Sequence, residues 1–228
     1  MHNFIIATVK SWNVRNFSKL KREMSGNWFL IDSKEDLTYE RIAEINPKYI
    51  FFPHWSWIVP SSIVENFECV CFHMADVPYG RGGSPLQNLI IRGHHSTKLT
   101  ALKMERLLDA GPVYMKSDLS LEGSAQEILK RCSELTFEMI KNIVSFEPIP
   151  QEQVGEVVEF KRRTPAESRL SENLELEKIY DFIRMLDAEG YPKAFLEYGD
   201  YTLELDSAEL KLEDDAVAAR VIIKPRTK

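Results

Sequence analysis

Short apolar runs alternate with amphipathic stretches from residue 1 to about residue 145. Runs of this length that are apolar on both faces predict buried strands, and strands separated by helices predict a largely parallel sheet. The predicted strands are 4–9, 28–31, 49–52, 69–72, 98–104 and 112–118. The pattern predicts an α/β fold, with an open, mostly parallel, Rossmann-like sheet covered by helices on both faces.

Helical spacing of apolar residues predicts helices over 36–45, 84–92 and 124–144. The first would be capped by Ser33 or Asp36, and the last begins behind a Ser124–Glu127 capping box. The 84–92 helix follows a glycine-rich loop directly, so its N-terminus would lie beside that loop.

The last 80 residues have a different pattern. Pro148 and Pro150 end the long helix, because proline cannot continue a helix and restricts its neighbour. A helix over 174–186 is followed by strands at 194–198, 201–205 and 217–223. Segregated elements predict a small α+β appendage, so we divide the chain into a catalytic domain, 1–148, and a C-terminal subdomain, 149–228.

Composition and charge narrow the class of protein. The chain is 44% hydrophobic and 28% charged, as ordinary globular proteins are, and 35 acidic against 29 basic residues give a net charge of −6. Affinity for nucleic acid is built from clustered Lys and Arg, so this balance argues against a nucleic-acid partner. The short basic run 161–163 is interpreted as a solvated linker, although it could still contact a phosphate.

The predicted compartment is the cytoplasm. The apolar run 4–9 is one strand long and too short for a signal peptide or a membrane span, so no membrane partner is expected. Three cysteines at 69, 71 and 132 form no disulfide framework, which fits a reducing compartment.

The segment 71–90, CFHMADVPYGRGGSPLQNLI, places His73 at the end of a strand and directly before a glycine-rich loop. Ligands of open α/β sheets bind outside the carboxyl ends of the strands. Arg81 offers planar donors, and a helix starting near 84 adds its N-terminal dipole, so the segment suggests an acid or base beside an anion site. An equally open interpretation is a strand-end histidine followed by a tight connection. The loop matches neither a Walker A motif nor GxGxxG.

A metal site is not expected. Cys69, Cys71 and His73 share one strand face, and His94 with His95 could add ligands. Side chains at i and i+2 point in parallel, however, and rarely converge on one ion.

These residues together bear a resemblance. His73 with Asp76–Val77–Pro78, then Arg81–Gly82, Pro85 and Gln87, and later 108–111, LDAG, resembles the N10-formyltetrahydrofolate-dependent formyltransferases. Their pattern is a strand ending N-x-H, then L-P-x-x-R-G-x-x-P-x-Q, and later D-x-G. The resemblance covers roughly residues 1–145 and implies a formyltransferase with N10-formyltetrahydrofolate as cofactor.

Within the family, the segment resembles most closely the nucleotide-sugar N-formyltransferases. The acidic charge, the short C-terminal piece and the stretches 182–187 and 190–195 favour this branch. It implies transfer of formyl to a nucleotide-linked amino sugar, a UDP-4-amino-4,6-dideoxy sugar, for formylated pseudaminic acid or a surface glycan. Formylation of methionyl-tRNA or a purine precursor, and a non-catalytic folate or nucleotide-sugar sensor, remain open alternatives.

The resemblance also implies roles for particular residues. His73 and Asp109 would be catalytic, with Asp109 orienting the imidazole; Trp57, Val77 and Asp109 would bind the cofactor. The expected substrate-binding residues are Lys10, Trp12, Asn13, Arg81, Gly82, Gln87 and Asn88. Packing at the rim or a strand-terminating lysine explains Trp57 and Lys10 equally well.

One position departs from the family pattern. Where the family has asparagine two residues before the histidine, this chain has Cys71. A thiol is a poor donor, so the asparagine's role toward the formyl oxygen would pass to His73, Gln87, Asn88 or backbone N–H groups. A homodimer is also expected, because Tyr198, Tyr201 and Leu203 offer a surface that could pair, although they could equally pack within the chain.

Overall fold

The computed structural model describes residues 1–226, which divide into two compact units. The first comprises 1–82, 98–119 and 130–159, and the second comprises 83–97, 120–129 and, as far as the structure describes it, 160–226. Each unit is therefore built from three separated segments. The domain boundary expected at 148 stays a prediction.

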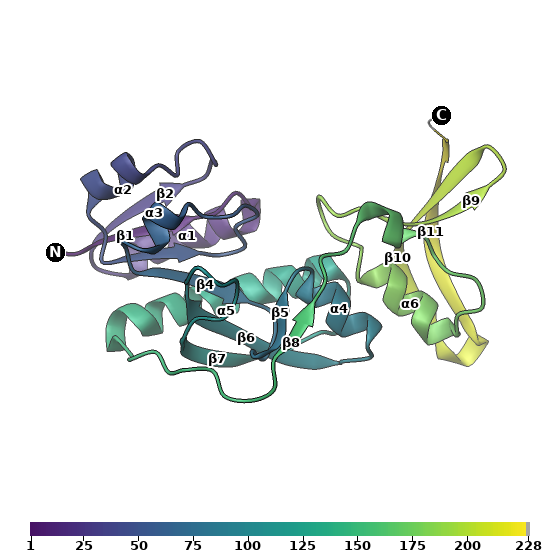
Figure 1. Ribbon diagram of the computed structural model, residues 1–228. Coiled ribbons are helices and arrows are strands. Elements are labelled where there is room, and N and C mark those ends of the chain that lie inside the picture. The colour runs from purple at the N-terminus through teal and green to yellow at the C-terminus, as the bar shows by residue number, and fades with distance from the viewer. Residues whose placement is uncertain (227–228) are drawn as a thin grey trace. The chain divides into compact units, whose positions relative to one another are not determined.

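The first unit is built on a six-stranded sheet in the order β2-β1-β3-β4-β6-β7 (Figure 1). Its strands are β1 (Asn3–Ala7), β2 (Asn27–Ile31), β3 (Tyr49–Phe52), β4 (Cys69–His73), β6 (Ser96–Lys103) and β7 (Val113–Ser120). The first four are mutually parallel, and β6 runs antiparallel to β4. The predicted open, mostly parallel α/β sheet is confirmed.

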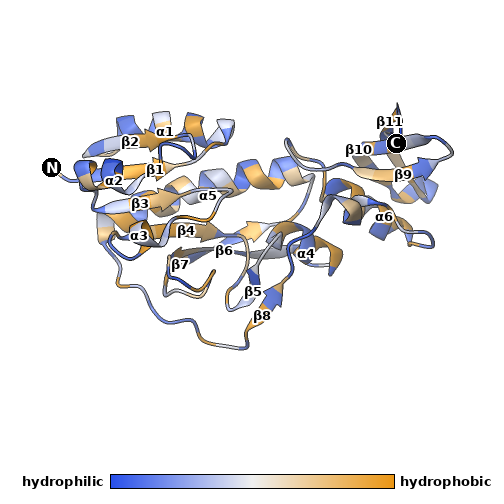
Figure 2. Cartoon of the chain, turned by 45° about the horizontal axis from the view of Figure 1, so that its top comes forward, coloured by the Kyte–Doolittle hydropathy of each residue, from blue (hydrophilic) through white to orange (hydrophobic). Residues whose placement is uncertain are grey.

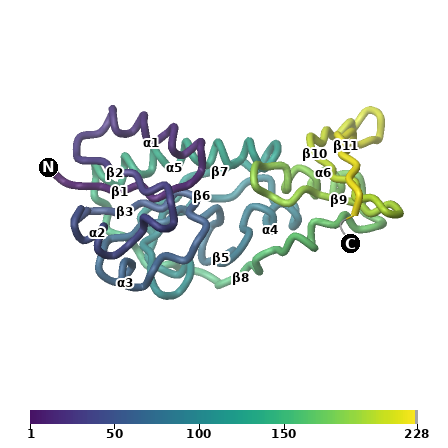
Figure 3. The backbone as a smooth tube through the Cα atoms, turned by 90° about the horizontal axis from the view of Figure 1, so that it is seen from above, coloured from purple at the N-terminus to yellow at the C-terminus, as the bar shows by residue number. Residues whose placement is uncertain are grey.

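Helices cover both faces of this sheet. The helices α1 (Ser11–Glu23) and α5 (Ala125–Phe146) lie along one side, and α2 (Tyr39–Ile45) and α3 (Ser61–Val64) along the other (Figure 3). Both faces of the sheet are apolar because side chains alternate along each strand. Ile5, Ile50 and Cys69 point into the core beneath Ile42 and Ile63, while their neighbours along the strands point to the opposite face. Figure 2 shows the apolar residues gathered along β1, β3 and β4.

The helix α1 was not predicted. Its buried residues are Trp12, Asn13, Phe17 and Leu20, so its inner face includes an asparagine, and no side chain caps its start at Lys10. The aromatic and leucine spacing was the available signal, but a polar residue within the apolar stripe obscured it. The expected caps of α2 are also wrong: Thr38 accepts the hydrogen bond from the Arg41 N–H, and Ser33 instead accepts one from the Asp36 N–H.

The second unit contains α4 (Pro85–Ile91), α6 (Leu176–Arg184) and an antiparallel sheet in the order β11-β10-β9. These strands are β9 (Ala194–Tyr198), β10 (Tyr201–Lys211) and β11 (Ala216–Pro225), and short 3-10 turns lie at Pro165–Ser168 and Leu212–Asp214. The predicted small α+β part is confirmed. The predicted capping box before α5 is confirmed too, since Ser124 and Glu127 each accept a hydrogen bond from the other's backbone N–H.

The glycine-rich loop contains a strand that was not predicted. Tyr79–Gly82 forms β5, which pairs with β8 (Val158–Phe160) in a two-stranded sheet. No helix in the described part of the chain is long and apolar enough to cross a membrane.

Candidate functional site

His73 ends β4 at the carboxyl edge of the sheet, and it is only 8% exposed. Its Nε2 lies 2.7 Å from the carbonyl oxygen of Gly80. A carbonyl can only accept, so Nε2 carries a proton and donates it to this bond. The nitrogen that can take up or release a proton is therefore Nδ1.

Asp109 faces this nitrogen from the loop between β6 and β7. Its Oδ2 lies 3.6 Å from His73 Nδ1 and accepts a hydrogen bond from the Gly82 N–H at 3.0 Å. The side chain is 10% exposed, and the backbone is left-handed with φ of 53°. At 3.6 Å the two groups form an ion pair only when the imidazole is protonated.

The loop around Asp109 depends on a close approach at Gly111. A Cβ at this position would lie 2.0 Å from the carbonyl oxygen of Lys103, so no larger residue fits without moving backbone. The D-x-G spacing therefore has a steric cause.

Arg81 is bound by a residue that sequence reasoning missed. Its Nε and Nη2 donate to Oε1 of Gln153, at 3.0 and 2.8 Å. Gln153 lies outside every motif, in a segment without regular structure, so periodicity gave no signal for it. The structure thus gathers His73, Asp109, Arg81 and Gly82 in one place and adds Gln153.

Cys71 lies two residues before His73 on the same strand face and is partly buried. Burial raises the pKa of its thiol, and the negative charge of Asp109 raises it further. Cys71 is therefore a neutral thiol at physiological pH. Burial also raises the pKa values of Cys69 and Cys132 to about 12, and no group of His, Cys, Asp and Glu within residues 1–226 could hold a metal ion.

The expected cofactor residues lie in contrasting surroundings. Trp57 is 40% exposed and packs edge-on against Trp55, with ring centroids 5.1 Å apart. The indole Nε1 of Trp55 is buried and has no hydrogen-bond partner among the described residues. Val77 is fully buried, and its carbonyl accepts from Lys116 Nζ at 2.6 Å, so its side chain offers no surface to a ligand.

The three substrate residues expected after β1 lie at the start of α1. Asn13 is buried and uses its amide within the protein: Nδ2 donates to Thr8 Oγ1 and to the Pro53 carbonyl, and Oδ1 accepts from Ser133 Oγ. Trp12 is buried as well, whereas Lys10 is partly exposed, with its Nζ 5.7 Å from the Trp12 ring. Of the three, Lys10 alone presents its functional group to a ligand.

His54 was also missed. It follows β3 at the same edge of the sheet, has a left-handed backbone with φ of 55°, and packs edge-on against Trp12. Burial lowers its pKa to about 4, and the charge of Lys10 acts in the same direction. His54 is therefore neutral at physiological pH.

Gln87 and Asn88 belong to the second unit, where their amides are occupied. Gln87 Nε2 donates to the Met185 carbonyl. Asn88 Nδ2 donates to the carbonyls of Gly83, Ser84 and Lys161, and its Oδ1 accepts from Arg92. These bonds assign both residues a part in packing that unit together.

Comparison with known proteins reveals close similarity over the whole chain. A solved structure of a methionyl-tRNA formyltransferase from Clostridium thermocellum is 50% identical, covers 99% of this chain and 100% of that chain, and superposes with a TM-score of 0.96. The family model for the methionyl-tRNA formyltransferase C-terminal domain matches residues 165–224.

Two further relatives extend the comparison. A methionyl-tRNA formyltransferase from Rickettsia felis is 30% identical over 77% of this chain and 60% of its own length, so the chain spans about three fifths of that relative. A structure of HypX from Aquifex aeolicus in complex with tetrahydrofolic acid shares the fold, with 17% identity, a TM-score of 0.75, and coverage of 91% of this chain and 38% of that one.

These similarities correct the expected branch. The nucleotide-sugar partner, and with it pseudaminic acid and glycan synthesis, is wrong, because the relatives that are 50% and 30% identical are methionyl-tRNA formyltransferases. The exclusion of nucleic acid is wrong for the same reason. Net charge sums the whole chain and does not describe local groups such as the exposed Lys161 and Arg162.

Proposed function

We propose a function from one premise: the chain belongs to the methionyl-tRNA formyltransferase family. The function is transfer of a formyl group from N10-formyltetrahydrofolate to the amino group of methionyl-tRNA. The observation that carries the proposal is the 50% identity over 99% of the chain. The pairing of His73 with Asp109 agrees with it, because a general base beside a carboxylate suits deprotonation of an amine.

The cofactor would supply the electrophilic formyl carbon. The loop carrying Trp55 and Trp57 suits a flat heteroaromatic ring, since it combines an exposed aromatic surface with a buried indole N–H that has no partner within the described chain. We assign Trp57 to this contact. Val77 would contribute only through its backbone.

His73 would move the proton. Its Nε2–H is fixed on the Gly80 carbonyl, so Nδ1 accepts the proton that the attacking amine loses. Asp109 then lies 3.6 Å from the newly charged imidazolium and stabilises it. The same Nδ1 would return the proton to the departing nitrogen, so that the imidazole would be neutral again at the end of the transfer.

Charged groups on the chain would hold the tRNA. Arg81 lies in β5, its guanidinium is bonded to the neutral Gln153, and it makes no ion pair within residues 1–226, so its charge remains available. Lys161 and Arg162 are exposed in the segment that follows β8. Phosphate contacts of this kind act locally and do not require a basic protein overall.

The test is direct. The protein is incubated with N10-formyltetrahydrofolate and methionyl-tRNA, and formylmethionine is measured after deacylation. Uncharged tRNA and free methionine serve as controls, and neither should acquire formyl. Absence of formylmethionine at saturating concentrations of both substrates contradicts the proposal.

A further inference from the structure

Gln153 joins two parts of the site through one amide group. Its Oε1 accepts two hydrogen bonds from Arg81, and its Nε2 donates to the carbonyls of Asp109 and Gly111 at 2.9 and 2.8 Å. Arginine only donates and carbonyls only accept, so one orientation of the amide satisfies all four bonds. The loop that carries Asp109 and the strand that carries Arg81 therefore share an anchor.

Gln153 is neutral, so it binds the Arg81 side chain without compensating its charge. A carboxylate at position 153 could accept the same two bonds, but it would cancel the charge of the guanidinium. Within the described chain Arg81 has no acidic partner, so it is fixed in orientation while its positive charge stays uncompensated. Its Nη1 edge is left for a further acceptor.

The same anchor constrains the acid–base pair. Among the described residues, His73 Nδ1 and the Gly82 N–H are the two polar groups that contact the carboxylate of Asp109, and Gly82 directly follows Arg81. Gln153 holds the backbone carbonyl of Asp109 on one side of this arrangement and the guanidinium side chain of Arg81 on the other. A shift of the loop would change the distance from carboxylate to imidazole.

We propose that Gln153 is a positioning residue for formyl transfer, a neutral clamp that aligns Asp109 with His73 while holding Arg81 charged for an anionic group of a substrate. The inference rests on the proposed function. The anion is a tRNA phosphate or the glutamate carboxylate of the folate, which share their chemistry toward a guanidinium.

Two substitutions distinguish the bonds that Gln153 makes to Arg81 from the bonds that it makes to the loop of Asp109. Gln153→Met keeps the length of the side chain and removes all four bonds, so it should lower kcat about ten-fold or more, because small misplacements of reacting groups are costly. Gln153→Glu keeps the acceptors for Arg81, cancels its charge and removes the donor to the loop. It should also raise the KM of the substrate that carries the anion. If that anion is a phosphate, the slope of log KM against log salt concentration should fall by about one.

Gln151 supplies a matched control. It lies two residues away, and within residues 1–226 its side chain bonds only to the Ile149 carbonyl of its own segment. Gln151→Met should therefore leave kcat, both KM values and the salt slope within about two-fold of the parent.

The experiment combines kinetics with hydrogen exchange of the unliganded protein. In Gln153→Met we expect backbone amides of 105–111 to exchange about ten-fold faster than in Gln151→Met, because two bonds to the loop are gone. A raised KM for methionyl-tRNA in Gln153→Glu identifies a phosphate, and a raised KM for the folate identifies its carboxylate.

The inference is overturned by either of two results: loop exchange in Gln153→Met equal to that in Gln151→Met, or faster exchange with unchanged kcat. Unchanged KM values in Gln153→Glu overturn the part concerning Arg81. If the parent protein forms no formylmethionine at all, the proposed function fails, and the exchange experiment still decides whether Gln153 holds the loop.

Discussion

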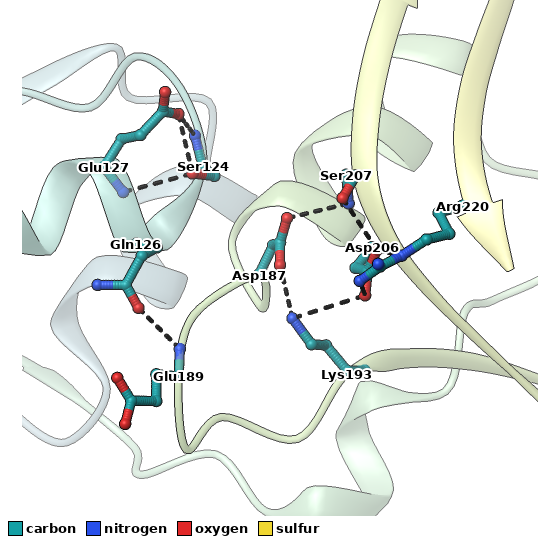
Figure 4. A network of polar contacts seen from close by, with 9 residues as sticks. All are labelled: Ser124, Gln126, Glu127, Asp187, Glu189, Lys193, Asp206, Ser207 and Arg220. Atoms are coloured by element: carbon teal, nitrogen blue, oxygen red, sulfur yellow. Dashed lines mark hydrogen bonds and ion pairs between the residues drawn. The ribbon is translucent and has the colours of Figure 1, made fainter. Parts of the chain in front are cut away.

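Two polar clusters in this chain hold their charges in opposite ways. In the second unit, Asp206 accepts two hydrogen bonds from Arg220, at 2.7 and 2.6 Å, and Lys193 lies between Asp206 and Asp187 (Figure 4). Every charge there faces an opposite charge. In the first unit, Arg81 is held by an amide and His73 Nε2 by a carbonyl.

The difference separates structure from chemistry. The mutually paired charges of the second unit fix β10 and the segment after α6, and no uncompensated charge of that cluster is available to bind a ligand. Charges held by neutral groups keep their capacity to bind an anion or exchange a proton. Substitutions in the two clusters should therefore affect different quantities, activity in the first unit and stability in the second.

The largest expected effect is on catalysis. His73→Asn keeps a donor for the Gly80 carbonyl and removes the nitrogen proposed to accept the proton, so kcat for formylation should fall about 10²- to 10⁴-fold. The melting temperature should change little. Near-normal turnover by this variant would exclude His73 as the proton acceptor.

The next effect is on stability. Asp206→Asn leaves Arg220 and Lys193 without their shared carboxylate, which is buried at 5% exposure, so the melting temperature should fall by roughly 3–8 °C. Glu204→Gln, which breaks the more exposed pair with Lys224, serves as the control and should cost about 1–2 °C or less. If Asp206→Asn lost formylation without a change in melting temperature, the assignment of this cluster to stability alone would be wrong.

A pH series sharpens the same contrast. The hydrogen bonds from Arg220 hold the pKa of Asp206 below its usual value of 3.8. A carboxyl with a lowered pKa stabilises the fold above its unfolded pKa, and this contribution is lost as the pH falls through the folded value. The difference in melting temperature between the parent and Asp206→Asn should therefore shrink as the pH falls from about 6 to about 2. A constant difference would mean that the charge of Asp206 does not stabilise the fold.

The smallest expected effect is a gain. Cys71→Asn restores the amide donor of the family pattern beside the formyl group, so kcat should rise by up to about ten-fold. Cys71→Ala is the control and should stay within about two-fold of the parent, because a neutral thiol donates weakly. A lower kcat for Cys71→Asn would show that another donor already serves the formyl oxygen.

The sheet could be predicted because its strands are apolar on both faces. β1, β3 and β4 are each four or five residues of nearly continuous hydrophobic sequence, and burial on both sides leaves few alternatives. The α1 helix could not be predicted in the same way. Its inner face includes Asn13, whose partners Thr8, Pro53 and Ser133 come from three different segments.

The site could be predicted only in part. His73, Asp109 and Arg81 belong to an ordered motif, so they could be named from the sequence, and the structure brings them together. Gln153 and His54 carry no local pattern, because their significance comes from contacts made across the fold. The branch was misjudged because whole-chain charge and a short C-terminal part say little about a local contact with tRNA.

The interleaving of the two units also governs the order in which the chain can fold during synthesis. The α4 helix is complete at Ile91, yet the carbonyl that receives the Gln87 amide belongs to Met185, which follows Gln87 by 98 residues. At roughly 5–20 residues per second on the ribosome, about 5–20 s pass before the partner of Gln87 is synthesised. Slowing translation should therefore lengthen the period in which α4 lacks this contact.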